Sequence, residues 1–137
     1  GILIENPSFV AEYTGLKNLE MLACIKNKIE IEDIRHAMEQ VGLDPDDKRT
    51  YKKYSLGMKQ KLGIAAAFME KPDIIILDEP INALDEAGAK QVHKILEEQK
   101  KRGALIIIAC HDKEELEMLS DEIIEIYEGR IVAGEKE

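Results

Sequence analysis

The chain has 137 residues, of which 45% are apolar, so it is long enough for one globular domain and too apolar for a disordered chain. Its formal net charge of −9 argues against a general nucleic-acid or anionic-membrane binder, because both surfaces repel acidic proteins. No apolar run reaches the ~20 residues that a membrane-spanning helix needs, and no secretory signal peptide is apparent. Cys24 and Cys110 lie far apart in apolar segments, which predicts buried thiols in the reducing cytoplasm.

The predicted elements begin with a pair of helices and then alternate between strands and helices. Apolar residues three or four apart predict the helices, and unbroken apolar runs predict strands buried on both faces of a parallel sheet. In chain order we expect a strand end at 1–4, helices at 16–23, 31–41 and 58–69, strand 74–77, helix 86–102, strand 104–109, a short helix capped by Asp112, and a hairpin of 123–127 with 130–133. Strand 74–77, helix 86–102 and strand 104–109 form a strand–helix–strand unit, for which parallel strands are expected.

Two adjacent carboxylates, Asp78 and Glu79, directly follow the apolar strand, and Pro80 ends it because proline cannot donate to the ladder. Open α/β sheets bind their ligands beyond the carboxyl ends of the strands, so the pair is predicted to lie at a ligand site. There Asp78 would bind Mg²⁺, and Glu79 would orient or deprotonate a water. The carboxylate pair therefore predicts metal-assisted phosphoryl transfer. The alternative is that both carboxylates only end the strand and face solvent.

A second candidate site is the predicted helix start at Ser55. Gly57 would let a ligand approach the backbone there, and the free amides and the helix dipole favour an anion. The alternative is a serine that only caps the helix. Residues 48–61 carry six cations and no acid, which favours the anion, although a solvated basic surface is the alternative for each of them.

Two further residues are candidates. His111 directly follows the second buried strand, so it is expected at the same sheet edge as Asp78, where it could donate a hydrogen bond to a terminal phosphate. The alternative is a structural histidine. Asp85 is predicted to cap the helix that begins at residue 86, a role that is compatible with a functional one. His36 and His93 are predicted to lie at the surface.

In this order and spacing, the motifs resemble those of the ATP-binding cassette (ABC) ATPase family over essentially the whole chain. Residues 54–58, Tyr-Ser-Leu-Gly-Met, are similar to the family's signature sequence, and Ile74 to Glu79 are similar to its Walker B strand. Asn82 to Asp85 resemble the D-loop, and His111 resembles the switch histidine.

The resemblance implies an α/β fold, with a P-loop NTPase-like core that has a mostly parallel sheet. Residues 16–53 would form a small helical subdomain, and residues 54–137 would form the part of the core that carries the signature, Walker B strand, D-loop and switch histidine. It implies ATP and Mg²⁺ as cofactors. It also implies a head-to-tail dimer with a second nucleotide-binding domain, in which each ATP lies between the phosphate loop of one domain and the signature of the other. The implied roles are the following: Ser55 and Gly57 contact the partner's ATP, Asp78 and Glu5 serve the metal, Glu79 acts on water, His111 contacts the γ-phosphate, and Asp85 relays between the two sites.

The sequence departs from the family in three ways. The phosphate-binding G-x-x-x-x-G-K-[ST] loop does not occur in the 137 residues, so the chain is expected to be the carboxyl two-thirds of such a domain, truncated at its amino end. Glu5 stands where the family has the Q-loop glutamine, which would add a negative charge near the metal. The signature has Leu56 in place of a glycine and Met58 in place of a glutamine.

The pattern Leu-Ile-Glu-x-Pro-x-Phe with Ser-Leu-Gly-Met-Lys-Gln is similar to exporter ATPases of the bacitracin-resistance and lantibiotic-immunity type. This resemblance implies an ATP-hydrolysing subunit at the cytoplasmic face of the cell membrane, with integral-membrane permease subunits as partners and a peptide antibiotic or drug as cargo. The alternatives are an ABC-type ATPase without a transporter and an inactive interaction fragment. Without a phosphate loop, the chain alone is expected to hydrolyse ATP negligibly, and its uncovered sheet is expected to cause self-association.

Overall fold

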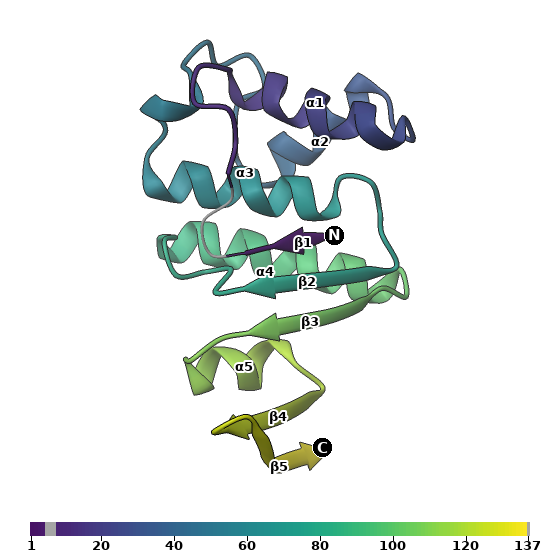
Figure 1. Cartoon of the computed structure of the whole chain (residues 1–137), viewed down its shortest axis with the longest axis vertical. Helices are drawn as coiled ribbons and strands as arrows, with labels where there is room; N and C mark the ends of the chain where they lie inside the picture. Colours follow the sequence, from purple (N-terminus) through teal and green to yellow (C-terminus); the bar gives the residue numbers. More distant parts are fainter. Residues whose placement is uncertain (5–7, 137) are drawn as a thin grey trace.

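A parallel three-stranded sheet forms the centre of the computed structural model, which describes residues 1–4 and 8–136 (Figure 1). The strand order is β1-β2-β3, with β1 at Ile2–Leu3, β2 at Ile74–Asp78 and β3 at Leu105–Ala109. The register of β2 and β3 runs without a shift from the Ile74–Leu105 pair to the Asp78–Ala109 pair. The predicted α/β class and the parallel strand–helix–strand unit are therefore confirmed.

The helices begin and end close to the predicted positions. They are α1 (Gly15–Lys26), α2 (Ile31–Gln40), the 3₁₀ turn η1 (Tyr51–Lys53), α3 (Leu56–Phe68), α4 (Glu86–Lys101) and α5 (Lys113–Leu119). The predicted caps Ser55, Asp85 and Asp112 each accept hydrogen bonds from amides of the first turn of their helix. The predicted closing hairpin is antiparallel, with β4 at Glu122–Tyr127 and β5 at Arg130–Lys136.

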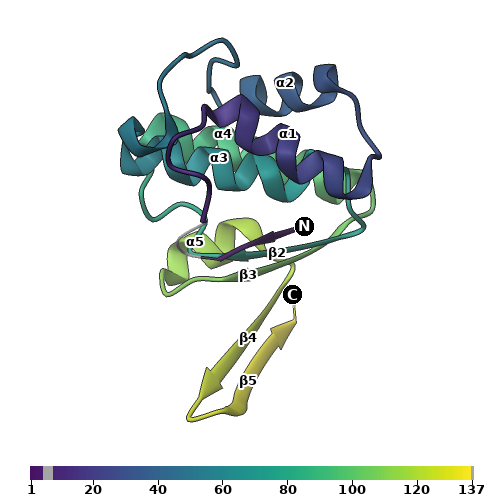
Figure 2. The same ribbon diagram turned by 45° about the horizontal axis from the view of Figure 1, so that its top comes forward.

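The helices α1 to α4 lie on one side of the sheet (Figure 2). α3 packs against β1 and β2, α4 packs against β3, and α1 and α2 form an outer layer over α3. The core between these layers contains fully buried side chains from each of them, among them Leu19, Met38, Leu62, Ile75 and Leu77. This arrangement places the amino end of α3 near the loop that follows β2.

The other face of the sheet is open. The prediction that its strands are buried on both faces is therefore wrong for this chain, whereas the uncovered sheet expected for a chain without the phosphate loop is present. Ile75 and Leu77 face the helices and are 1% exposed, whereas Ile74 and Ile76 are 52% and 40% exposed. Successive side chains of a strand point to opposite faces, and here only one face has a helical cover. In β3, Leu105 and Ile107 are exposed for the same reason. The open face therefore presents large apolar side chains.

Two smaller predictions also differ from the structure. Cys24 is exposed and Cys110 is only half-buried, and both are free thiols. α1 buries Leu19 and Ala23, and Cys24 lies about 100° further around the helix, away from that face. His36 is exposed as predicted, but His93 is half-buried. Within residues 1–4 and 8–136, no helix is long and apolar enough to span a bilayer.

Candidate functional site

The carboxylate of Glu79 and the imidazole of His111 meet beyond the carboxyl ends of β2 and β3. Glu79 Oε1 lies 2.6 Å from His111 Nδ1, and it also accepts a hydrogen bond from the His111 backbone amide at 3.2 Å. The Glu79 amide in turn donates to the carbonyl oxygen of Ala109 at 2.8 Å. The prediction that the carboxylate pair and His111 share one sheet edge is thus confirmed, because parallel strands end at the same edge.

The two partners differ in exposure and in charge. The Glu79 side chain is 21% exposed and the His111 side chain is 78% exposed, so solvent reaches the imidazole from its outer side. The hydrogen bond to the Glu79 carboxylate and the charge of that group raise the pKa of His111 above its ordinary value. The histidine is therefore more readily cationic at neutral pH than a free imidazole, which suits a group that faces an anion.

Asp78 is half-buried in the last position of β2, opposite Ala109 of β3. Its carboxylate is a hard oxygen donor of the kind that Mg²⁺ prefers. In the part of the chain that the structure describes, no group of three or more acidic, histidine or cysteine side chains could hold a metal by itself. This donor set fits Mg²⁺ held by one or two carboxylates together with phosphate oxygens and water. Glu5, the other residue assigned to the metal, lies outside the described residues.

The amino end of α3 forms a second cluster of predicted residues. Ser55 Oγ accepts a hydrogen bond from the Met58 amide at 3.2 Å, so the capping role is confirmed. Gly57 lies against the loop after β2: a Cβ atom at this position would be 3.0 Å from the carbonyl oxygen of Ala83. Asp85 caps α4 by accepting from the Gly88 amide at 2.9 Å. The residues predicted to be signature and D-loop are therefore in contact within one chain.

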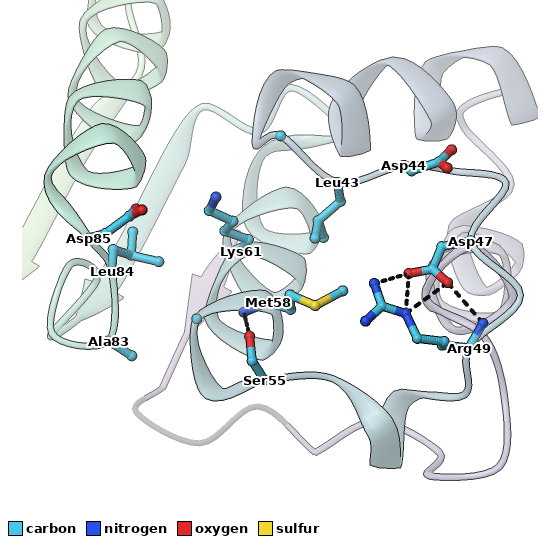
Figure 3. Close-up of a pocket in the computed structure, with 12 residues that line it drawn as sticks. Leu43, Asp44, Asp47, Arg49, Ser55, Met58, Lys61, Ala83, Leu84 and Asp85 are labelled. Atoms are coloured by element: carbon cyan, nitrogen blue, oxygen red, sulfur yellow. Dashed lines mark hydrogen bonds and ion pairs between the residues drawn. The ribbon is translucent and has the colours of Figure 1, made fainter.

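A groove of about 490 Å³ opens between this cluster and the loop after α2 (Figure 3). Its lining residues come from three segments: Gly42, Leu43, Asp44, Asp47 and Arg49 after α2; Ser55, Gly57, Met58 and Lys61 from the start of α3; and Ala83, Leu84 and Asp85 from the loop before α4. Three carboxylates and two cations therefore line it.

The predicted cationic patch is partly neutralised in the structure. Arg49 forms an ion pair with Asp47 at 2.7 Å, and this guanidinium lowers the pKa of Asp47. Lys59 lies over the ring of Tyr51, 5.2 Å from its centroid. The sequence run from 48 to 61 contains no acid, but Asp47 directly precedes it, and Asp44 and Asp85 line the same groove. An anion at this groove would therefore meet a mixed surface.

Sequence reasoning missed one residue at the site, Gln60. The residue is 6% exposed, and its Nε2 donates to the carbonyl oxygens of Glu79 and Pro80 at 2.9 Å and 3.1 Å. The signal that could have found it is a polar residue on the face of α3 that also carries the buried Ile64 and Phe68. A buried amide of this kind needs a partner of its own.

Known proteins resemble this chain closely. The sequence family described as ABC transporter matches residues 1–82. The ABC transporter ATP-binding protein YybJ of Bacillus subtilis is 46% identical over 136 residues, which cover 99% of this chain and 62% of that protein. The bacitracin transport ATP-binding protein BcrA of Enterococcus faecalis is 40% identical over 96% of this chain and 43% of its own length. The lantibiotic transport ATP-binding protein SrtF of Streptococcus pyogenes is 39% identical over 96% of this chain and 57% of its own length.

Solved structures have the same fold. An ATP-binding subunit of an ABC transporter superimposes with a TM-score of 0.89 at 28% identity, over 98% of this chain and 57% of the other. A dimeric ATP-binding cassette bound to ADP and Pi also gives 0.89, at 20% identity, and that likeness concerns the fold alone. The chain spans less than two thirds of the length of these relatives.

Proposed function

Because this chain belongs to the ABC transporter ATP-binding family, we propose that it forms part of a subunit that binds and hydrolyses ATP to drive transport. The observation that carries the proposal is the 2.6 Å contact between Glu79 and His111 at the end of the parallel strands, directly after Asp78. This edge is where an α/β sheet offers a ligand its polar groups. The proposed reaction requires a phosphate-binding loop, which the 137 residues do not contain.

In the proposed reaction, each residue at this edge has its own task. Asp78 would hold Mg²⁺, which would neutralise charge on the phosphates. Glu79 accepts a proton from the attacking water or orients it, and the imidazole of His111 donates a hydrogen bond to the terminal phosphate. The contact between Glu79 and His111 keeps both groups at the place where that phosphate would arrive. Glu5 is assigned to the metal by family resemblance only.

The amino end of α3 serves a second copy in this proposal. Ser55 and Gly57 face the ATP that the partner holds, and Asp85 relays between the two sites of a head-to-tail dimer. The contact of Gly57 with the loop that contains Ala83 supports the relay, because both segments then move together. ATP at such a site is bound by backbone amides and the helix dipole more than by the nearby cations.

The proposed partners include integral-membrane permease subunits, which place the protein at the cytoplasmic face of the cell membrane. The bacitracin and lantibiotic transport proteins among its relatives support export of a peptide antibiotic or drug. α1 exposes Met21, Leu22 and Ile25, an apolar surface of the kind that supports a protein partner. An inactive interaction module is the second candidate for the 137 residues by themselves, because the sequence lacks the phosphate loop.

The proposal is tested in a protein that carries this chain together with a G-x-x-x-x-G-K-[ST] loop. Glu79→Gln should reduce hydrolysis by at least about 100-fold, since it removes the base, and should leave ATP affinity within a few-fold of the unmodified protein. Fluorescent-nucleotide binding and phosphate release measure the two quantities. Turnover that survives Glu79→Gln would falsify the role of Glu79.

A further inference from the structure

Gln60 joins the two halves of the candidate site within one chain. It lies in α3, five residues after Ser55, and its side chain crosses to the loop after β2. Among the described residues, Nε2 donates there to two carbonyl oxygens, those of Glu79 and Pro80, at 2.9 Å and 3.1 Å. Because a carbonyl can only accept, these contacts fix which end of the amide points to the loop.

The loop needs such support at Glu79. This residue has φ +47°, in the left-handed region, which is unfavourable for a residue other than glycine. Its amide is bonded to Ala109, and its carbonyl accepts from Gln60 and, at 3.4 Å, from the Asn82 amide. The side chain is held by His111. Each group of Glu79 therefore has a partner, and Gln60 is the partner that comes from the signature helix.

We propose that Gln60 is a positioning residue that aims the Glu79 carboxylate and couples it to the helix end at Ser55. The inference rests on the proposed function, because a position matters only if Glu79 acts on a water. α3 is one continuous helix that Ser55 caps, so a displacement at Ser55 when a partner closes would be transmitted along it to the carbonyl of Glu79. The hydrogen-bonded amide of Gln60 connects the two segments directly.

Gln60→Met tests the proposal, since methionine has a similar shape but no donor. The first measurement is the NMR titration of the three histidines in the 137-residue chain. Without Gln60 the Glu79 carboxylate should turn from the imidazole, so the titration midpoint of His111 should fall toward the ordinary value. This measurement needs no turnover, so it decides the positioning role even if the proposed hydrolysis fails.

The second measurement is hydrolysis in the protein that also carries the phosphate loop. A misdirected base should lower kcat by about 10- to 100-fold with little change in KM. If Gln60 acts through Glu79, the variant Gln60→Met with Glu79→Gln should be no slower than Glu79→Gln alone. Independent losses that multiply would overturn the proposal.

Gln99→Met is the matched control. Gln99 is a second buried glutamine, 8% exposed, which lies in α4 and accepts from Arg102 at 3.2 Å. Gln99→Met removes a buried amide in the same way as Gln60→Met, but it should change neither the titration midpoint of His111 nor kcat. Equal effects of the two substitutions would mean that Gln60 is only a packing residue.

If Gln60→Met does not fold, the coupling can be measured from the other residue of the pair. Glu79→Gln, at a half-buried position, should shift the side-chain amide resonance of Gln60 and leave that of Gln99 in place. An unchanged Gln60 resonance in Glu79→Gln would overturn the coupling.

Discussion

Ser55 caps α3 and, in the proposed function, also contacts a phosphate, and these two roles can be separated by substitution. Its Oγ accepts from the Met58 amide at 3.2 Å, and Thr14 Oγ1 caps α1 by accepting from the Lys17 amide at the same distance. We therefore expect Ser55→Ala and Thr14→Ala to lower the free energy of unfolding by similar amounts, about 1 kcal/mol each. In a domain of this size that loss lowers Tm by roughly 4 °C.

Ser55→Asp should keep the cap and remove the function. Aspartate accepts the same hydrogen bond, and its charge suits a helix amino end, so Tm should stay within about 2 °C of the unmodified chain. The new charge would face the phosphate. Two unit charges 4 Å apart repel by about 4 kcal/mol at an effective dielectric constant of 20, and half of that value already slows hydrolysis about 30-fold.

Thermal denaturation of the 137-residue chain measures Tm, and phosphate release in the protein with a phosphate loop measures the rate of hydrolysis. Thr14→Asp is the matched control, because it makes the same change at a cap outside the candidate site and should keep both stability and hydrolysis. If Ser55→Asp hydrolyses ATP as fast as Thr14→Asp, Ser55 is a structural cap alone.

Two further predictions concern the electrostatics of the site and the open sheet face. Glu79→Gln should lower the pKa of His111, measured by NMR titration; an unchanged midpoint would mean that the 2.6 Å contact does not persist in solution. Since the pKa of His111 is raised in the folded chain, the contact stabilises the fold fully below the ordinary histidine pKa near 6.5. The stabilisation is lost as the pH rises through the pKa of the folded chain. The free energies of unfolding of the unmodified chain and of Glu79→Gln should therefore converge in alkaline solution. The chain should self-associate in light scattering, and Ile76→Lys on the open face should reduce the mass, whereas Met118→Lys on α5 should not. A monomeric mass for the unmodified chain would contradict this expectation.

The elements of the fold could be predicted because their signals are local. The continuous apolar runs placed β2 and β3, and serine or aspartate before an apolar helix placed the caps at Ser55, Asp85 and Asp112. The meeting of Glu79 with His111 was also predictable, since it follows from parallel strands that end at one edge. Each of these inferences depends on residues that are near in sequence or on one rule of topology.

The rest depends on which segments the fold brings together. A buried strand face and an exposed apolar face have the same composition, so the exposure of Ile74 and Ile76 could not be read from the run itself. The basic character of 48–61 was misleading for a local reason, because Asp47, the residue before this run, pairs with Arg49. The fold also brings Asp85, which is distant in sequence, to the same groove. The carbonyl partners of Gln60 lie on a loop 19 and 20 residues away, at a separation set by the packing of α3 on β2.

The most direct test of the central claim is to mix two inactive proteins. Ser55→Asp and Glu79→Gln, each in a protein with a phosphate loop, would form mixed dimers in which one site has both native residues and the other has both substitutions. If Ser55 of one copy and Glu79 of its partner act on the same ATP, an equal mixture should regain about a quarter of the native rate, because about half of the dimers are mixed and each has one intact site. A rate no higher than that of the two variants measured apart would contradict a shared site.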